Sequence, residues 1–187
     1  MTDRNRVTLY TGGHKGTEAE FGRCAERWGI AEVTLSFAGH QPERDRNLRV
    51  LSDAELIRGD VSMEIVSKRM GRTYHSGEKI RRVFQLIYHT VNHSYHVFAV
   101  GWIQGDDTVQ GGTGWGVELA KFFNRPVTVF DQGRKIWATW KGTHWAPDVA
   151  TIPDRPFAAT GTRNLTEEGR EAIRDLFERS FGAEPRA

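Results

Sequence analysis

Cysteine is nearly absent from this chain of 187 residues, and long apolar runs are absent altogether. The single cysteine, Cys24, excludes an intrachain disulfide and a zinc site built from cysteines. No apolar run approaches the ~18 residues of a membrane span, and the first residues lack the apolar core of a signal peptide. We therefore expect a soluble, cytoplasmic protein that does not contact a membrane.

The chain also lacks a surplus of charge of either sign. It carries 26 basic and 24 acidic side chains, which gives a formal net charge of +2, and the two signs are interspersed. Proteins that bind nucleic acids usually present a clustered basic face, so we do not expect a nucleic acid as partner. The length lies within the ~100–200 residues that are typical of a domain. Residues 1–187 are therefore expected to form a single domain.

What the chain does contain is an alternation of short apolar runs with amphipathic segments. Apolar runs predict strands at 7–11, 32–37, 95–101, 127–131, 135–140 and 157–160. Helical spacing of apolar residues predicts helices at 17–28, 60–70, 80–91, 113–125 and 167–181. Residues 39–51 are polar and rich in arginine, and we expect them to form a charged surface loop. The alternation predicts an α/β fold, a Rossmann-like three-layer sandwich with a mainly parallel sheet.

Two glycine-rich turns, each between an apolar stretch and a helix, are the most informative feature. Unpaired backbone N–H groups and the positive end of a helix meet at such a turn, and together they attract a phosphate. Two such turns predict a ligand held between two helix N-termini at one edge of the sheet. The candidate ligand-binding residues are Gly12, Gly13, Lys15, Gly16 and Thr17 in the first turn, Gly111, Gly112, Thr113 and Gly114 in the second, and Thr162 and Arg163 in a third turn near the C-terminus.

The second turn, Gly111 to Glu118, reads Gly-Gly-x-Gly-x-x-x-Glu. This resembles the signature of the "lonely guy" phosphoribohydrolases, which belong to the SLOG superfamily with DNA-processing protein A and the molybdenum-cofactor carriers. The segment Thr160 to Arg163 resembles the turn that opens the chain in typical members. Because it comes last here, the resemblance implies a circularly permuted arrangement, which is allowed when the termini lie close together. The strand around Ala158 should then pair in parallel with the strand around Leu9.

The resemblance implies a nucleotide-like ligand and leaves two functions open. The first is hydrolysis of the N-glycosidic bond of a nucleoside monophosphate, in which a carboxylate stabilises positive charge on the sugar or activates water. Glu118 is the catalytic candidate by motif and Glu20 by analogous position, and the alternative for both is a helix-end carboxylate. The second function is a non-catalytic carrier or sensor. It is favoured by Gln110 and Trp115, which stand where the enzymes carry proline and threonine.

Three histidines and the aromatic residues lead to two further expectations. His89 and His93 are four residues apart on one helix, as a two-ligand metal site requires, but His96 falls in the next strand. We interpret them as a polar flank of a buried helix and expect no metal and no cofactor.

The six tryptophans and ten phenylalanines leave material for a hydrophobic interface, which predicts a homodimer. The third-turn Arg163 is expected to bind phosphate, the alternative being a surface salt bridge.

Overall fold

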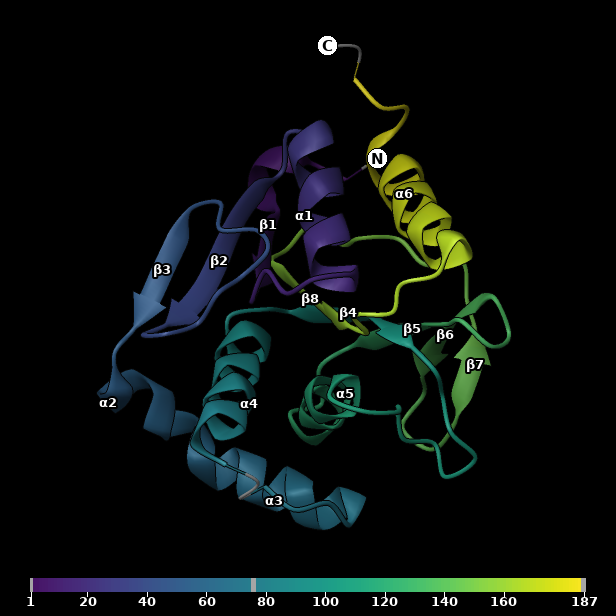
Figure 1. Cartoon of the computed structure of the whole chain (residues 1–187). Coiled ribbons are helices and arrows are strands. Elements are labelled where there is room, and N and C mark those ends of the chain that lie inside the picture. The colour runs from purple at the N-terminus through teal and green to yellow at the C-terminus, as the bar shows by residue number, and fades with distance from the viewer. Residues whose placement is uncertain (1, 75–76, 186–187) are drawn as a thin grey trace.

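The computed structural model describes residues 2–74 and 77–185, in which eight strands form one sheet (Figure 1). The strands are β1 (Thr8–Thr11), β2 (Ala31–Phe37), β3 (Leu48–Leu51), β4 (His96–Gly101), β5 (Val127–Asp131), β6 (Ile136–Trp140), β7 (Trp145–Pro147) and β8 (Phe157–Gly161). Their order across the sheet is β3-β2-β1-β8-β4-β5-β6-β7. All neighbours from β3 to β5 are parallel, and β6 and β7 extend the sheet as antiparallel strands. The expected α/β fold with a mainly parallel sheet is confirmed.

Helices cover both faces of this sheet (Figure 1). On one face lie α1 (Thr17–Arg27) and α6 (Glu167–Phe181), and on the other lie α4 (Glu78–Asn92) and α5 (Thr113–Phe122), with α3 (Asp60–Met70) packed against α5. The short α2 (Asp53–Leu56) and the 3₁₀ turns η1 (Arg4–Arg6) and η2 (Ile57–Gly59) complete the described elements. Local sequence fixes the helix starts. Thr166 caps α6 by accepting from the Gly169 amide, and Ser52 forms a capping box with Glu55.

Each face of the sheet has its own buried apolar cluster. Phe21 of α1 and Trp28, which directly follows that helix, pack with Phe177 of α6 on one side. On the other side Trp115 of α5 stacks on Phe84 of α4, with ring centroids 4.2 Å apart. The central parallel strands β8, β4 and β5 are nearly all buried, as expected where a sheet is covered on both faces. In the residues that the structure describes, no helix is long and apolar enough to cross a membrane.

The last strand of the chain lies at the centre of the sheet. Strand β8 pairs in parallel with β1, where Leu9 is opposite Phe157 and Tyr10 is opposite Ala158. On its other side β8 pairs in parallel with β4. The pairs between β8 and β1 join residues far apart in the chain, so no local effect of the sequence produces them. The expected pairing of the two terminal strands is confirmed, and Figure 1 shows both termini on the same side of the molecule.

The segment 39–51 is not entirely the loop that the sequence predicts. Its last four residues form β3, which pairs in parallel with β2. Strand β3 lies at the edge of the sheet, and Leu48 and Val50 on it are 46% and 57% exposed. A strand of four residues with arginine between its apolar residues has too little apolar periodicity to stand out from a charged loop. Its pairing with β2 is a tertiary effect, because β2 offers a free edge.

Candidate functional site

A cavity of about 340 Å³ opens at the carboxyl edge of the sheet, where three turns meet. These turns follow β1, β8 and β4, which are neighbours in the sheet. The carboxyl ends of adjacent parallel strands lie at one edge, and this edge is where ligands bind in α/β sheets. The cavity is lined by His14 and Glu18, by Val83, Phe84 and Ile87 of α4, by Trp102, by Gln110, Gly111, Gly112 and Thr113, and by Thr160, Gly161, Thr162, Arg163 and Asn164.

The first glycine turn is already filled by an anion of the protein itself. The carboxylate of Glu18, the second residue of α1, accepts hydrogen bonds from the backbone amides of Gly12 (3.0 Å) and His14 (3.2 Å) and from the Thr11 hydroxyl (3.2 Å). The amide of Gly13 donates to the same hydroxyl. The turn therefore holds a carboxylate where the sequence predicts a bound phosphate. This finding corrects the expectation of two open turns.

The glycines of the first turn serve close packing of the chain against itself. A Cβ on Gly16, whose φ is +88°, would lie 2.6 Å from the carbonyl oxygens of Thr162 and Arg163. The Thr17 amide and hydroxyl both donate to the Thr162 carbonyl, at 3.1 and 2.9 Å. Gly13, with φ +67°, accepts from the amide of Arg44. The contacts of Gly16 and Thr17 bring the turn after β8 onto the start of α1, and the contact of Gly13 joins the first turn to the loop after β2. Positive φ and a missing Cβ allow these close approaches.

The second glycine turn, in contrast, is open to the cavity. Gly111, Gly112 and Thr113 line it at the N-terminus of α5. No described residue accepts a hydrogen bond from the backbone amides of these three residues. Unpaired amides at the positive end of a helix favour an anion. Gly114 differs, because a Cβ there would lie well inside 3.0 Å of the Val109 carbonyl oxygen. Gly114 thus packs against protein, whereas a Cβ on Gly112 would meet open space.

Arg163 adds a cation to the same cavity. It follows β8 in the turn 161–164, is exposed, and lines the cavity together with Thr162. Among the described residues no carboxylate pairs with its guanidinium, whereas most arginines of the molecule have such partners. The alternative of a surface salt bridge is therefore not what the structure contains. An unpaired guanidinium beside open amides is suited to phosphate, which it can bind through two parallel hydrogen bonds.

The remaining wall of the cavity is apolar. Val83, Phe84 and Ile87 of α4 face it, and the half-buried Trp102, whose carbonyl accepts from the Gln110 amide, lines it beside the glycine turn. Trp102 has no aromatic partner among the described residues, in contrast to Trp115, which lies in the core against Phe84. A flat apolar surface beside an anion-binding end is the arrangement that a nucleobase with a phosphate requires. The sequence pattern did not single out Trp102, since one tryptophan after a strand carries no signal.

A carboxylate–imidazole pair also lines the cavity. His14 Nδ1 lies 2.9 Å from Glu18 Oε2, and the two side chains are 14% and 7% exposed. The Glu18 carboxylate raises the pKa of His14, against the opposing effects of burial and of Arg163. Burial of Glu18 opposes its ionisation, but the charge and hydrogen bonds of His14 outweigh burial and lower the pKa of Glu18. The pair is therefore ionised over a wider pH range than either side chain would be alone.

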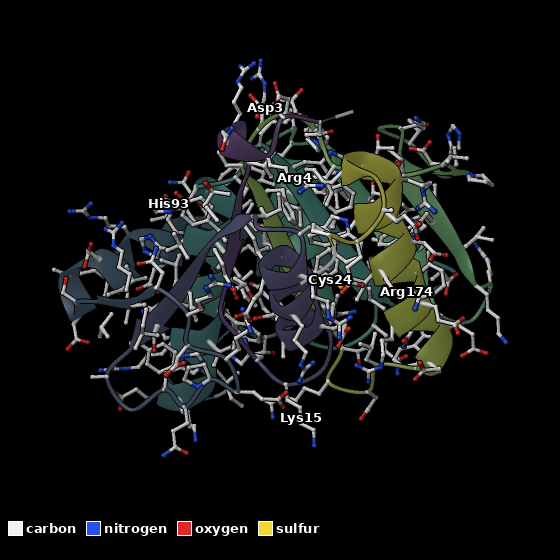
Figure 2. All side chains as sticks on the ribbon, turned by 90° about the horizontal axis from the view of Figure 1, so that it is seen from above. Asp3, Arg4, Lys15, Cys24, His93 and Arg174 are labelled. Carbon is white, nitrogen blue, oxygen red and sulfur yellow. The ribbon has the colours of Figure 1, made fainter. Side chains whose placement is uncertain are left out.

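None of the candidates of the first turn and helix lines the cavity, which holds for Gly12, Gly13 and Gly16 and also for Lys15, Thr17 and Glu20. Lys15 is exposed and lies at the edge of the molecule in Figure 2. Thr17 is buried and its hydroxyl is already used. Glu20 pairs with Arg23 (2.9 Å) and with Arg170 of α6 (2.6 Å). Two residues along a helix turn a side chain by about 200°, so Glu18 faces the turn while Glu20 faces α6. The expected catalytic placement of Glu20 is corrected accordingly.

Glu118 lies in a different part of the molecule from the cavity. Its Oε1 is 2.7 Å from Nζ of Lys121, and that ammonium group lies 3.9 Å from the Trp140 ring centroid and 4.8 Å from that of Trp145. Both side chains of the pair are nearly buried and line a separate hollow near Asp107. Glu118 is the sixth residue of α5, so it projects from a side of the helix that the glycine turn does not share. The expected position of Glu118 on the cavity wall is corrected.

The three histidines of the metal hypothesis each have a partner of their own. Nε2 of His89 contacts the Glu55 carbonyl at 2.8 Å, and Nδ1 of His93 contacts the His89 carbonyl at 2.7 Å. Nε2 of His96 contacts the Thr128 hydroxyl at 2.9 Å, and burial lowers the pKa of His96 to about 4. Within residues 2–74 and 77–185, no group of three or more potential ligand side chains is arranged to hold a metal ion.

Comparisons of the chain with protein-family models, with curated proteins and with solved structures found no match.

Proposed function

We propose that this protein binds a nucleotide-like ligand in the cavity, with the phosphate at the second glycine turn and the base against the apolar wall. The observation that carries the proposal is the unpaired guanidinium of Arg163 on the same cavity as the open amides of Gly111 to Thr113. Gly111, Gly112 and Arg163 are exposed, so water can satisfy these donors until an anion replaces it. A doubly charged phosphate satisfies both the amides and the guanidinium.

The size and the chemical asymmetry of the cavity support the same ligand class. About 340 Å³ lies at the lower end of the ~300–1,000 Å³ that is usual for small-molecule sites. Its lining combines the donors of the second turn and of Arg163 with the apolar side chains of Phe84, Ile87 and Trp102. Inorganic phosphate alone would leave the apolar side chains uncovered, and an apolar ligand alone would leave the donors unpaired. A nucleoside monophosphate has a group for each.

The fold that we propose is a Rossmann-like three-layer sandwich with the permuted SLOG arrangement. The central position of β8 between β1 and β4 supports it, as do the two helical layers. The activity that we propose is hydrolysis of the N-glycosidic bond of the bound nucleotide. A non-catalytic carrier or sensor is the second candidate, and the position of Glu118 outside the cavity favours it. Both share the ligand class and differ in whether base is released.

Calorimetric titration with nucleoside 5′-monophosphates and with the matching nucleosides tests the ligand class. We expect the monophosphates to bind at least about tenfold more tightly, because a hydrogen bond to a charged group contributes about 1.5–3 kcal/mol. Arg163→Gln should reduce this preference, and Arg134→Gln, which alters an exposed arginine paired with Asp131, is the matched control. Equal affinity for nucleoside and monophosphate, or an unchanged preference in Arg163→Gln, would contradict the phosphate site.

A further inference from the structure

The segment 102–110, which we call the arm, joins β4 to the second glycine turn. Its two ends lie side by side, because the Gln110 amide donates to the Trp102 carbonyl at 3.0 Å. Ile103 and Val109 pair next to them in an antiparallel bridge. The arm is therefore a short hairpin, and both residues at its open end, Trp102 and Gln110, line the cavity.

Two cationic side chains anchor the backbone of the arm. The guanidinium of Arg72 donates to the carbonyls of Val109 and Gly111, at 3.1 and 2.9 Å. At the tip of the arm, the ammonium group of Lys121 donates to the Asp107 carbonyl at 2.8 Å. The arm is thus fixed at both ends by the protein itself. A ligand that contacts it does not have to order it first, which lowers the entropic cost of binding.

The side chain of Trp102 takes no part in the apolar cores. It belongs to none of the three buried clusters, whereas each of the other five tryptophans belongs to one or packs against it. Among the described residues, the Trp102 ring has no aromatic partner and its Nε1 has no hydrogen-bond acceptor. One edge of the ring lies beside the turn after β5, where a Cβ on Gly133 would be 3.5 Å from Trp102 Cδ1. A half-buried indole that no core uses is suited to stacking on a flat ligand.

Gln110 adds a polar group next to this ring. In the part of the chain that the structure describes, its carboxamide has no hydrogen-bond partner, whereas the carboxamides of Gln85, Gln104 and Gln132 all have one. A carboxamide presents one acceptor and two donors in a fixed plane. The edges of the nucleobases differ in their order of donors and acceptors. The free carboxamide of Gln110 is therefore suited to distinguish one base from another.

We propose that the arm recognises the base of the bound nucleotide: the Trp102 ring stacks on the base, and the Gln110 carboxamide selects among bases by hydrogen bonds to the base edge. This inference rests on the proposed nucleotide binding and adds the residues that determine its specificity. Gln110 directly precedes the open amides of the second glycine turn. One anchored segment of the chain thus contacts both the base and the phosphate.

Calorimetric titration with the four common nucleoside 5′-monophosphates and with ribose 5-phosphate tests the stacking. Trp102→Ala should weaken binding of all four nucleotides by about 5- to 150-fold, the usual contribution of base stacking on an aromatic side chain. Binding of ribose 5-phosphate, which has no base, should not change. Trp102→Phe keeps a ring and should restore most of the lost affinity. Tyr95→Ala is the matched control, because Tyr95 is a 41% exposed aromatic residue on a different hollow; it should bind every probe as the wild type does.

The order of affinities for the four nucleotides tests the role of Gln110. Gln110→Leu keeps a side chain of similar size without polar groups, so the differences between the bases should shrink. Gln110→Glu presents two acceptors, which match the adjacent N1–H and N2–H donors of guanine. Relative to the other three nucleotides, the affinity for guanosine monophosphate should therefore rise at least about fivefold, the lower end for a bidentate contact to a base. Gln41→Glu adds the same charge at an exposed glutamine that does not line the cavity, and should keep the wild-type order.

The outcomes distinguish this inference from the function on which it rests. If none of the nucleotides binds the wild type, the proposed function itself fails. If they bind and Trp102→Ala keeps the wild-type affinity, nucleotide binding stands and the stacking role of Trp102 is overturned. An equal loss of affinity for ribose 5-phosphate and the nucleotides also overturns it, because Trp102 would then only support the shape of the cavity. An unchanged order of affinities in both Gln110 variants would overturn base selection by Gln110.

Discussion

Gly112 and Gly114 stand two residues apart in one turn, and the structure gives them opposite roles that mutation can separate. A Cβ on Gly114 would lie well inside 3.0 Å of the Val109 carbonyl oxygen, and Val109 is fully buried. That carbonyl also accepts from Arg72 and lies in a bridge between Ile103 and Val109, so it cannot withdraw easily. We expect Gly114→Ala to destabilise the fold while Gly112→Ala does not.

The expected magnitude follows from two opposing terms. Overpacking of a closely packed site costs about 1–3 kcal/mol, and alanine gains up to about 1 kcal/mol over glycine in a helix. Gly114→Ala should therefore lower the free energy of unfolding by about 1–2 kcal/mol. At this chain length that corresponds to a Tm lower by about 2–8 °C. Gly112 has φ −63° and open space around its Cβ position, so Gly112→Ala should change the stability by less than about 0.5 kcal/mol.

Ligand affinity should show the reverse order. A valine at Gly112 places a branched side chain where the phosphate is proposed to lie, and we expect binding of a nucleoside monophosphate to weaken at least about tenfold. Thermal unfolding followed by circular dichroism, combined with calorimetric titration, measures both properties on the same samples. Full affinity in Gly112→Val would refute the phosphate position, and an unchanged Tm in Gly114→Ala would refute the packing argument.

Three further predictions concern other parts of the molecule. Lys121→Met leaves the nearly buried Glu118 without its partner and should lower the free energy of unfolding by about 3–5 kcal/mol, measured by chemical denaturation. A decrease of less than about 1 kcal/mol would show that water already solvates the pair. Burial lowers the pKa of His96 to about 4 in the folded state, against 6.5 in the unfolded state. The free energy of unfolding should therefore fall by about 2–3 kcal/mol as the pH falls from about 6.5 to 4. His96→Gln should flatten that part of the curve of unfolding free energy against pH. We still predict a homodimer, with an interface formed by exposed aliphatic residues such as Leu48 and Val50, because nearly all the aromatic side chains are at least partly buried. Light scattering should report a dimer for the wild type and a monomer for Val50→Lys. A monomeric wild type would refute the prediction.

The elements that the sequence predicts well are those with a strong local period. The apolar face of α4 and the capping residue Thr166 of α6 were predicted from spacing and residue type alone. Strands β1, β2, β4, β5 and β8 are rich in apolar residues, and β4 is nearly a continuous apolar run, as is typical of strands in a sheet covered on both faces. The edge strand β3 and the short β7 were missed, because an edge strand is stabilised by its neighbour and needs little apolar sequence of its own.

The choice of acidic residue shows where local pattern stops being informative. Motif and position favour Glu118 and Glu20, whereas the carboxylate on the cavity is Glu18. The sequence places three glutamates near two helix starts, but it does not show which side of its helix each one occupies. In the structure Glu18 faces the sheet edge, Glu20 faces α6 and Glu118 faces Lys121. A shift of two residues along a helix moves a side chain to nearly the opposite face.

By itself the sequence determined the alternation of strands and helices, the parallel character of the sheet and the presence of glycine turns at strand ends, because these follow from the period of apolar residues and from the conformational freedom of glycine. Only the tertiary structure decided which turn is open. The first turn is closed because the Glu18 carboxylate binds its amides and the turn after β8 packs on Gly16. The second turn is open because the chain supplies no carboxylate to it. The bonds of Glu18 are local, but their formation depends on the helical phase that turns Glu18 to the turn. The packing of the turn after β8 joins segments 145 residues apart, which no local pattern encodes.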